Sequence, residues 1–348
     1  MSMILFTERD IAIDMGTDNT LLFIDGKGLR LREPTVVAVD RTNMQMLRVG
    51  EDARKMLGRT PANSAAVQPI RHGVISDYDM ATLMLKELIK QVTSFSLFKP
   101  RVLMTVPGCI TGVEERAVID ACIEGGCRKV YLTESSLATA YGAGLDVNSP
   151  NGQLIMDIGS GTTEIAVISE GGVVESASIK TAGGAFDDAI IRYIRRKFNV
   201  LIGRRTAEDL KMSIGCVKAR PGADREEVKG RCLITGLPRS ITVTAADMAE
   251  AVAEPTEAVL DALHSVLERT PPELVADISE NGVVLSGGGS LLYGFDALVT
   301  EHTGIPANVV DDPLSCTCYG AGRMLTRLNN MSEGMINLAR RKQIRSLN

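Results

Sequence analysis

The feature that most constrains this chain is a short pattern that occurs twice. An apolar strand ends at Asp-x-Gly, turns through small polar residues and returns as a second apolar strand, at residues 11–24 and again at 154–168. Apolar runs on both sides of a Gly-rich turn predict β-hairpins. The spacing is much longer than a solenoid repeat, so the duplication predicts two similar α/β domains that each contribute one hairpin to a shared cleft.

The segments between the hairpins supply the other elements of such domains. Residues 78–93 have apolar side chains at helical spacing, and a Thr cap at Thr111 with Glu114 three residues later predicts a helix over 111–124. Further buried strands are predicted at 101–106, 130–133 and 283–285, and further helices at 135–142, 186–198, 206–214, 245–268 and 290–302. The predicted fold class is therefore α/β.

The composition of the chain argues against several classes of function. The 348 residues carry a net charge of −5, with 4% aromatic residues and no Trp, which argues against a nucleic-acid partner. The seven cysteines include no CxxC pair, so we expect reduced thiols rather than a zinc site. The first residues do not form a signal peptide, and no apolar run approaches the roughly 20 residues of a membrane span. These features predict a cytoplasmic protein that is at most peripheral to a membrane.

The two hairpin turns have the chemistry of phosphate binding. Glycine allows the backbone to approach a phosphate closely, and hydroxyls and N–H groups can bind its oxygens. An acid at the end of each first strand could hold Mg²⁺, through water because this ion dehydrates reluctantly. One such turn alone is typical of an ordinary hairpin, whereas two favour a clamp on a β- and γ-phosphate. The candidate residues are Asp14, Gly16, Thr17, Asp18 and Asn19, then Asp157, Gly159, Ser160, Gly161 and Thr162.

A third Gly-rich turn lies between the strand at 283–285 and the helix predicted at 290–302. A helix N-terminus there could face an α-phosphate or ribose, and glycines would allow an adenosine to lie flat on the backbone. Glu208 and Lys211 are three residues apart on one helix face, which indicates either a surface ion pair or contacts to the ribose and adenine edge. The candidate residues of the turn are Gly287, Gly288, Gly289, Ser290 and Leu291.

Rival nucleotide and hydrolase motifs are absent from the sequence. It has no GxxxxGK[ST] loop and no GxGxxG followed by a distant acid. With three histidines in the whole chain, a Ser-His-Asp hydrolase or a His-rich metal site is not indicated.

These three turns, in this order, resemble the phosphate and adenosine motifs of the actin, sugar-kinase and heat-shock ATPase superfamily. Within it, the sequence resembles the MreB family of bacterial cell-shape actins over about residues 8–325. The matching segments are DIGSGTTEIAVI (157–168), FKPRVLMTVPGCITGVEERAVIDA (98–121), PPELVADISENGVVLSGGGSLL (271–292) and TGIPANVVDDPLSC (303–316).

The resemblance implies an actin-like fold of two related α/β domains around a cleft for ATP and Mg²⁺. The first domain is expected at 1–146 plus 312–348, with an inserted subdomain at about 32–76. The second is expected at 147–311, with an insert at about 186–250. Residues 17–19 and 160–162 would line the two phosphate loops, Glu208 and Lys211 would flank the nucleoside, and residues 288–291 would form the adenosine loop.

The sequence departs from the family pattern at three positions. Asp18 replaces the usual Ala, and Ser160 replaces the middle Gly of the second loop. The largest departure is in the interdomain helix, where the family has Glu-Glu-Pro and this chain has Glu134-Ser135-Ser136. Ser135 falls on the position of the catalytic Glu, and a serine cannot act as a carboxylate base near neutral pH. We therefore expect ATP binding with slow or absent hydrolysis, with Ser135 and Glu134 as the catalytic candidates.

The family also implies partners. We expect homopolymer filaments at the inner face of the cell membrane, together with membrane proteins of cell-wall elongation, and no nucleic acid. The loop that contains Phe95, Leu97 and Phe98 beside Lys99 and Arg101 predicts either packing onto its subdomain or shallow membrane insertion. The alternatives are a hydrolysis-deficient paralogue that co-assembles with other filaments, a monomeric sugar kinase and a chaperone ATPase. For the last two, we find no sugar-binding motif and no C-terminal peptide-binding domain.

Overall fold

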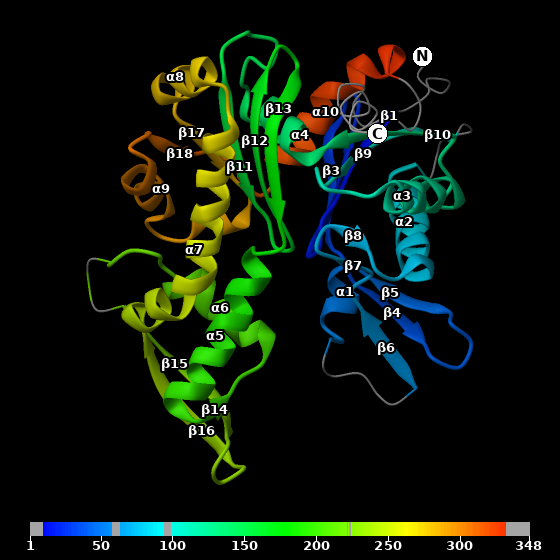
Figure 1. Ribbon diagram of the computed structural model, residues 1–348. Helices are drawn as coiled ribbons and strands as arrows, with labels where there is room; N and C mark the ends of the chain where they lie inside the picture. Colours follow the sequence, from blue (N-terminus) through cyan, green and yellow to red (C-terminus); the bar gives the residue numbers. More distant parts are fainter. Residues whose placement is uncertain (1–9, 58–62, 94–98, 221, 223, 332–348) are drawn as a thin grey trace. The chain divides into compact units, whose positions relative to one another are not determined.

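The computed structural model describes residues 10–57, 63–93, 99–220, 222 and 224–331. The chain divides into two compact units (Figure 1). Unit 1 comprises residues 1–149, 170–173 and 315–348, and unit 2 comprises 150–169 and 174–314. The units are described separately below.

The centre of unit 1 is a five-stranded mixed sheet. Its strand order is β10 (Lys129–Glu134), β9 (Arg101–Val106), β1 (Asp10–Met15), β2 (Asn19–Ile24) and β3 (Gly28–Pro34). β1 is antiparallel to β2 and parallel to β9, and β9 is parallel to β10.

Helices cover both faces of this sheet, because successive side chains along β1 are buried on opposite faces. Ile11 and Ile13 pack with α2 (Tyr78–Thr93) and α3 (Gly112–Glu124), whereas Ala12 between them packs with α4 (Ser135–Ala143) and α10 (Cys316–Met324). Side chains that alternate in this way place the sheet between two helical layers. α10 leads into the short 3₁₀ helix η2 (Leu325–Asn330).

Small sheets complete unit 1. One has the order β5 (Met46–Val49), β4 (Val37–Asp40) and β6 (Ser64–Val67), with the short helix α1 (Glu51–Arg54) after β5. The other is the hairpin of β7 (Ile70–Arg71) and β8 (Val74–Ile75).

Unit 2 repeats the sheet of unit 1. Its order is β13 (Gly172–Ile179), β12 (Thr163–Ser169), β11 (Gln153–Ile158), β17 (Val283–Ser286) and β18 (Ala307–Val309). β11 is antiparallel to β12 and parallel to β17, which is parallel to β18, so β11 and β12 occupy the places of β1 and β2. The prediction of two similar α/β domains, each with a central hairpin, is confirmed.

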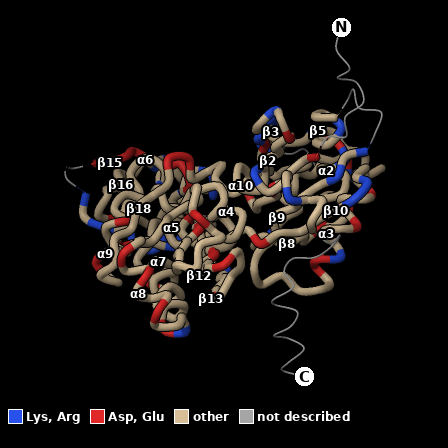
Figure 2. Tube along the Cα trace, turned by 90° about the horizontal axis from the view of Figure 1, so that it is seen from above, with Lys and Arg blue, Asp and Glu red and all other residues tan. Residues whose placement is uncertain are grey.

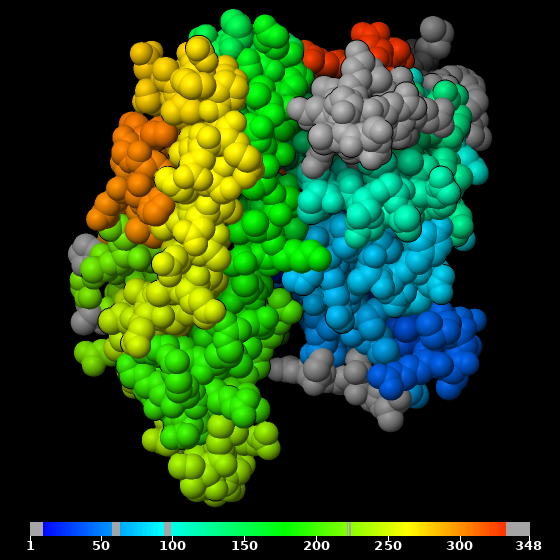
Figure 3. Space-filling model, in the orientation of Figure 1, coloured from blue at the N-terminus to red at the C-terminus, as the bar shows by residue number. Residues whose placement is uncertain are grey.

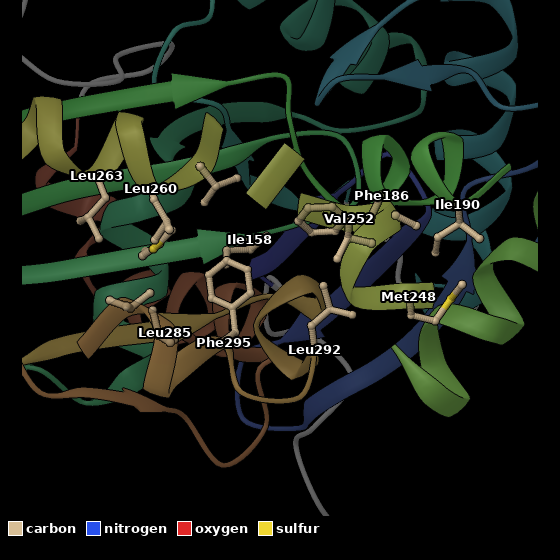
Figure 4. Packing of buried hydrophobic residues seen from close by; sticks show 14 of the residues in the cluster. Ile158, Phe186, Ile190, Met248, Val252, Leu260, Leu263, Leu285, Leu292 and Phe295 are labelled. Atoms are coloured by element: carbon tan, nitrogen blue, oxygen red, sulfur yellow. The ribbon is translucent and has the colours of Figure 1, made fainter. Parts of the chain in front are cut away.

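The helices of unit 2 are α5 (Gly183–Phe198), α6 (Arg204–Ile214), α7 (Ala245–Arg269), α8 (Pro272–Asn281) and α9 (Phe295–Thr303). A second sheet contains β14 (Val200–Leu201), β15 (Arg225–Cys232) and β16 (Pro238–Thr244). Figure 4 shows side chains of β11, α5, α7, β17 and α9 meeting in one core, with Ile158 and Phe295 near its middle. α7 and α8 form part of the surface seen in Figure 3.

The helix predicted over residues 290–302 begins later than expected. The turn after β17 continues as a 3₁₀ helix, η1 (Gly288–Leu291), and α9 begins only at Phe295. Gly294 has φ 80°, a left-handed conformation that interrupts a helix, and the Tyr293 carbonyl accepts a hydrogen bond from Val217 N instead of from the next turn. The capping box of Thr111 and Glu114 is present as predicted.

The cysteines are reduced, and charges of both signs are mixed over the surface. All seven cysteines are free thiols, and six of them are buried. Lys and Arg are interspersed with Asp and Glu along each unit (Figure 2). Among the helices that the structure describes, none combines the length and the apolar character needed to cross a bilayer.

Candidate functional site

The two predicted phosphate loops have the same backbone turn. Gly16 N donates to Asn19 O at 2.9 Å, and Gly159 N donates to Thr162 O at the same distance. A Cβ atom on either glycine would lie 3.0 Å from that carbonyl oxygen, which is tighter than nearly all real contacts. The turn itself therefore favours a glycine in each Asp-x-Gly pattern, because a larger residue would push the carbonyl aside.

The first loop is held by polar contacts within unit 1. Thr35 Oγ1 donates to Gly16 O at 2.8 Å, and Thr17 Oγ1 accepts from Gly73 N at 3.0 Å. The carboxylate of Asp18 accepts from Gln68 Nε2 at 3.1 Å. The acid that departs from the family pattern is thus hydrogen-bonded to a neighbouring segment of its own unit.

The second loop is held by the start of α5. Gly183 N donates to Gly159 O at 3.0 Å and Gly184 N donates to Ser160 O at 2.7 Å. Thr163 Oγ1 donates to the carbonyl of Thr181 at 2.7 Å. The chain before and within the first turn of α5 therefore supports the loop from one side.

The acids at the ends of β1 and β11 have different surroundings. Asp14 accepts a hydrogen bond from Thr105 Oγ1 at 2.6 Å. Burial raises the pKa of Asp14, and this hydrogen bond offsets the rise only in part. Asp157 lies directly across the ladder from Glu164, whereas Asp14 lies across from Leu21.

Glu164 is a candidate residue that the sequence-based predictions missed. It is buried, and its carboxylate accepts from Ser178 Oγ at 2.6 Å. Acids directly opposite each other in antiparallel strands repel unless a cation or a proton intervenes. The signal was available in the spacing, because a four-residue turn places Glu164 opposite Asp157.

The third Gly-rich turn packs on the end of β11. Gly287 has φ 79° and ψ 161°, and a Cβ atom there would lie 2.4 Å from Ile158 O and 2.5 Å from Asp157 Oδ1. A Cβ atom on Gly289 would lie 2.3 Å from Ile158 Cγ2. These two glycines are buried and serve close packing, while Gly288 and Leu291 are exposed and remain accessible to a ligand. Ser290 is also buried and donates to Gly287 O at 2.7 Å.

Lys211 contacts an acid that was not predicted. Its ammonium lies 2.7 Å from Asp187 Oδ1, as an ion pair, and donates to Gly183 O at 2.9 Å. Burial raises the pKa of Asp187 to about 6, although the charge of Lys211 acts in the opposite direction. Glu208 lies on the same helix as Lys211 and its negative charge adds a smaller rise.

Ser135 and Glu134 lie on different elements. Glu134 is the last residue of β10 and is 2% exposed, whereas Ser135 is the first residue of α4 and is partly exposed. Ser135 Oγ donates to Val106 O at 3.1 Å. Glu134 therefore precedes the helix, as its N-cap residue, and is buried at the end of the strand.

The membrane candidates Phe95, Leu97 and Phe98 lie outside the described residues. Arg101, expected to lie near lipid headgroups, begins β9 and forms a bidentate ion pair with Asp10 at 2.8 and 2.6 Å. Its side chain is 18% exposed. The charge of Arg101 is therefore paired within unit 1.

The comparisons with known proteins agree over nearly the whole chain. The family model described as MreB/Mbl protein matches residues 8–333. The cell shape-determining protein MreB of Escherichia coli K12 is 47% identical over 92% of this chain and 94% of its own length. The cell shape-determining protein Mbl of Bacillus subtilis 168 is 45% identical over 93% of this chain and 97% of its own length.

Solved structures share the fold. MreB5 of Spiroplasma citri bound to ADP superposes with a TM-score of 0.89 at 32% identity, over 93% of this chain and 99% of that one. A second crystal structure of that protein, bound to AMPPNP, gives 0.87. The MamK double helical filament gives 0.78 at 20% identity over 92% of this chain and all of that one, a likeness of fold alone. The predicted actin-like fold is confirmed, and this chain belongs to the MreB/Mbl family of actin-like, cell shape-determining proteins.

Proposed function

We propose that this protein binds Mg·ATP and polymerises into filaments at the inner face of the cell membrane, where they organise cell-wall synthesis and rod shape. The observation that carries the proposal is the pair of matching Asp-x-Gly turns, which have the same Gly N to carbonyl hydrogen bond in both units. A related protein with this fold has been crystallised with ADP and with AMPPNP.

The two loops supply the groups that hold the phosphates. Thr17 and Asn19 in the first loop, and Ser160 and Thr162 in the second, are partly exposed and carry hydroxyl or amide groups that can bind phosphate oxygens. On the third turn, Gly288 and Leu291 are the accessible positions for the adenosine. Lys211 and Glu208 complete the proposed set from α6.

The residues present fit a magnesium ion. Asp14 and Asp157 offer carboxylate oxygens, the ligand type that Mg²⁺ prefers. Within the described ranges, no three His, Cys, Asp or Glu side chains form a metal-binding group, which suits an ion held largely by water and phosphate. When bound, the ion would neutralise phosphate charge, while the two acids would orient its water ligands.

We propose that hydrolysis is slow. Ser135 is the accessible residue at the position of the catalytic acid, and its hydroxyl proton is engaged by the Val106 carbonyl. Glu134 is too buried to reach water without a rearrangement. Loss of a general base reduces rates by about 10²–10⁴. The same observation favours a second candidate function, a regulatory paralogue that binds ATP and co-assembles with other filaments.

Light scattering and sedimentation with purified protein test the proposal. Scattering should rise on addition of Mg·ATP above a critical protein concentration, and the polymer should pellet. The variant Asp157→Asn keeps the shape of the side chain but removes its charge, and it should lower both the scattering and the pelleted fraction. A chain that binds ATP but sediments as a monomer at every concentration would contradict the filament proposal, and co-pelleting with another MreB would then support the paralogue.

Membrane association is tested separately with vesicles that contain anionic lipid. We expect the wild type to co-sediment with these vesicles, and the triple variant Phe95→Ser, Leu97→Ser and Phe98→Ser to bind less. Equal binding of the two proteins would argue against this loop as the membrane contact. A separate Lys99→Gln variant measures how much the charge of Lys99 contributes to vesicle binding, since Arg101 is already paired with Asp10.

A further inference from the structure

The sequence predicted Lys211 as a contact of the nucleoside, but it did not predict that Lys211 forms a buried ion pair with Asp187. Asp187 lies one turn after the start of α5, and Lys211 lies in α6. Their side chains are 4% and 15% exposed. A buried carboxylate loses much of its hydration, so it is held in its charged form by the ammonium beside it.

The position of this pair follows from how α5 begins. The N–H groups of Gly183 and Gly184 donate to the carbonyls of Gly159 and Ser160, so the first turn of α5 lies against the second phosphate loop. Asp187 is one helical turn after Gly183 and projects from that same end of the helix.

Lys211 reaches the same place from α6. A Cβ atom on Gly183 would lie 3.4 Å from Lys211 Nζ, 3.2 Å from Gly159 O and 3.3 Å from Ser160 Cα. The ammonium therefore stands next to the second loop. The close spacing also gives a physical reason for a glycine at position 183.

The ammonium of Lys211 keeps donor capacity for a ligand. It donates one hydrogen bond to Gly183 O and is held 2.7 Å from Asp187 Oδ1 by charge, and an ammonium carries three N–H donors. With these two contacts fixed, the side chain does not swing freely as an exposed lysine does, and less entropy is lost when a remaining N–H binds an acceptor.

We propose that Asp187 is a positioning residue, which holds the ammonium of Lys211 beside the second loop so that it binds a phosphate oxygen of the nucleotide rather than the ribose or adenine. The inference rests on the proposed ATP binding. It replaces the expectation that Lys211 contacts the nucleoside edge. A compact ammonium is a point charge well suited to phosphate.

Affinities for Mg·ATP, ADP and adenosine, measured by calorimetry and by competition, test this assignment. The single variants are Asp187→Ala, Asp187→Asn and Lys211→Gln. The double variants are Asp187→Ala with Lys211→Gln, and the neutral pair Asp187→Asn with Lys211→Gln. The matched control is the neutral pair Asp247→Asn with Lys197→Gln. It removes another Lys–Asp contact of unit 2, and Lys197 lies roughly 20 Å along α5 from Gly183.

We expect Lys211→Gln and Asp187→Ala each to weaken binding of ATP and ADP about tenfold or more, the effect of one charge-assisted hydrogen bond, with adenosine unchanged. Asp187→Asn keeps an acceptor for Lys211 and should retain affinity. Adding Asp187→Ala to Lys211→Gln should cost nothing further, because Asp187 acts through Lys211. The control pair should leave the ratio of ATP to adenosine affinity unchanged.

Three results would overturn the proposal. They are an equal loss of adenosine and ATP affinity in Lys211→Gln, additive effects of the two single changes, or wild-type ATP affinity in the neutral pair. The neutral pair preserves side-chain shape, so it decides the matter even if Asp187→Ala does not fold. If the wild type fails to bind Mg·ATP, the proposed function has failed rather than this inference.

Discussion

Replacement of Gly287 by Ala tests how tightly the third Gly-rich turn packs on the second phosphate hairpin. Gly287 has φ 79° and ψ 161°, a region that is essentially restricted to glycine. The added methyl would lie 2.4 Å from Ile158 O and 2.5 Å from Asp157 Oδ1. Ile158 O is a backbone atom, so the backbone must move, and the Asp157 carboxylate must shift as well.

The magnitude follows from two terms. Backbone strain in this region costs about 1–3 kcal/mol, and overpacking of a tight site costs about 1–3 kcal/mol. We expect Gly287→Ala to destabilise unit 2 by roughly 2–6 kcal/mol. Movement of the Asp157 carboxylate should also weaken binding of Mg·ATP.

Gly304→Ala is the matched control. Gly304 ends α9 with φ 72° and ψ 1°, and no heavy atom lies within 4 Å of its added Cβ. Gly304→Ala should therefore lower the free energy of unfolding only by the cost of a left-handed backbone conformation, about 1–2 kcal/mol. Scanning calorimetry of both variants should show a Tm for Gly287→Ala several degrees below that for Gly304→Ala, since about 2–4 °C corresponds to 1 kcal/mol at this size. Equal Tm values and unchanged ATP affinity would refute the packing described here.

Other changes give separate tests. Ser135→Glu should raise steady-state phosphate release by about 10²–10⁴, with Ser135→Gln as the control without a base; an unchanged rate, or a wild type as fast as Escherichia coli MreB, would contradict the assignment. Asp18→Ala should tighten Mg·ATP binding severalfold, most at low salt, and weaker binding would show that this acid serves the metal. At Asp247, burial alone would raise the pKa, but hydrogen bonds from Lys197, Thr244 and Tyr193 lower it to about 2. Its stabilisation, about 2 kcal/mol at most, should be complete above pH 3.8 and disappear as pH falls through about 2; a pH-independent stability difference from Asp247→Asn in urea would contradict this.

Local patterns predicted the hairpins because their causes are local. Each Asp-x-Gly turn is closed by a hydrogen bond between residues three apart, Gly16 N to Asn19 O and Gly159 N to Thr162 O. The geometry of each turn is therefore determined by a few consecutive residues. The same holds for the cap of α3, which needs only Thr111 and Glu114. Such features can be predicted without knowledge of the rest of the fold.

Contacts between distant segments could not be predicted in this way. The glycines of the third turn were expected to make room for an adenosine, but Gly287 and Gly289 make room for Ile158, more than 120 positions earlier in the chain. The ion pair of Lys211 with Asp187 depends on how α5 and α6 meet. The ion pair of Arg101 joins β9 to Asp10 of β1, 91 positions earlier in the chain, and no local pattern indicated it.

The departures from the family pattern are interpretable only in their surroundings. The sequence shows only that an acid, Asp18, replaces the usual Ala, and the structure adds that its carboxylate accepts a hydrogen bond from Gln68 of the same unit. For Ser135, the sequence identified the missing carboxylate, and the structure adds that Glu134 belongs to the preceding strand.

Calorimetric titration of the wild-type protein with Mg·ATP tests the central claim most directly. Saturable binding at one site per chain, weakened when Asp14→Asn and Asp157→Asn are combined, is the result that the two matching turns predict. An absence of both heat and competition by ADP, in a protein that is shown to be folded, would contradict the account.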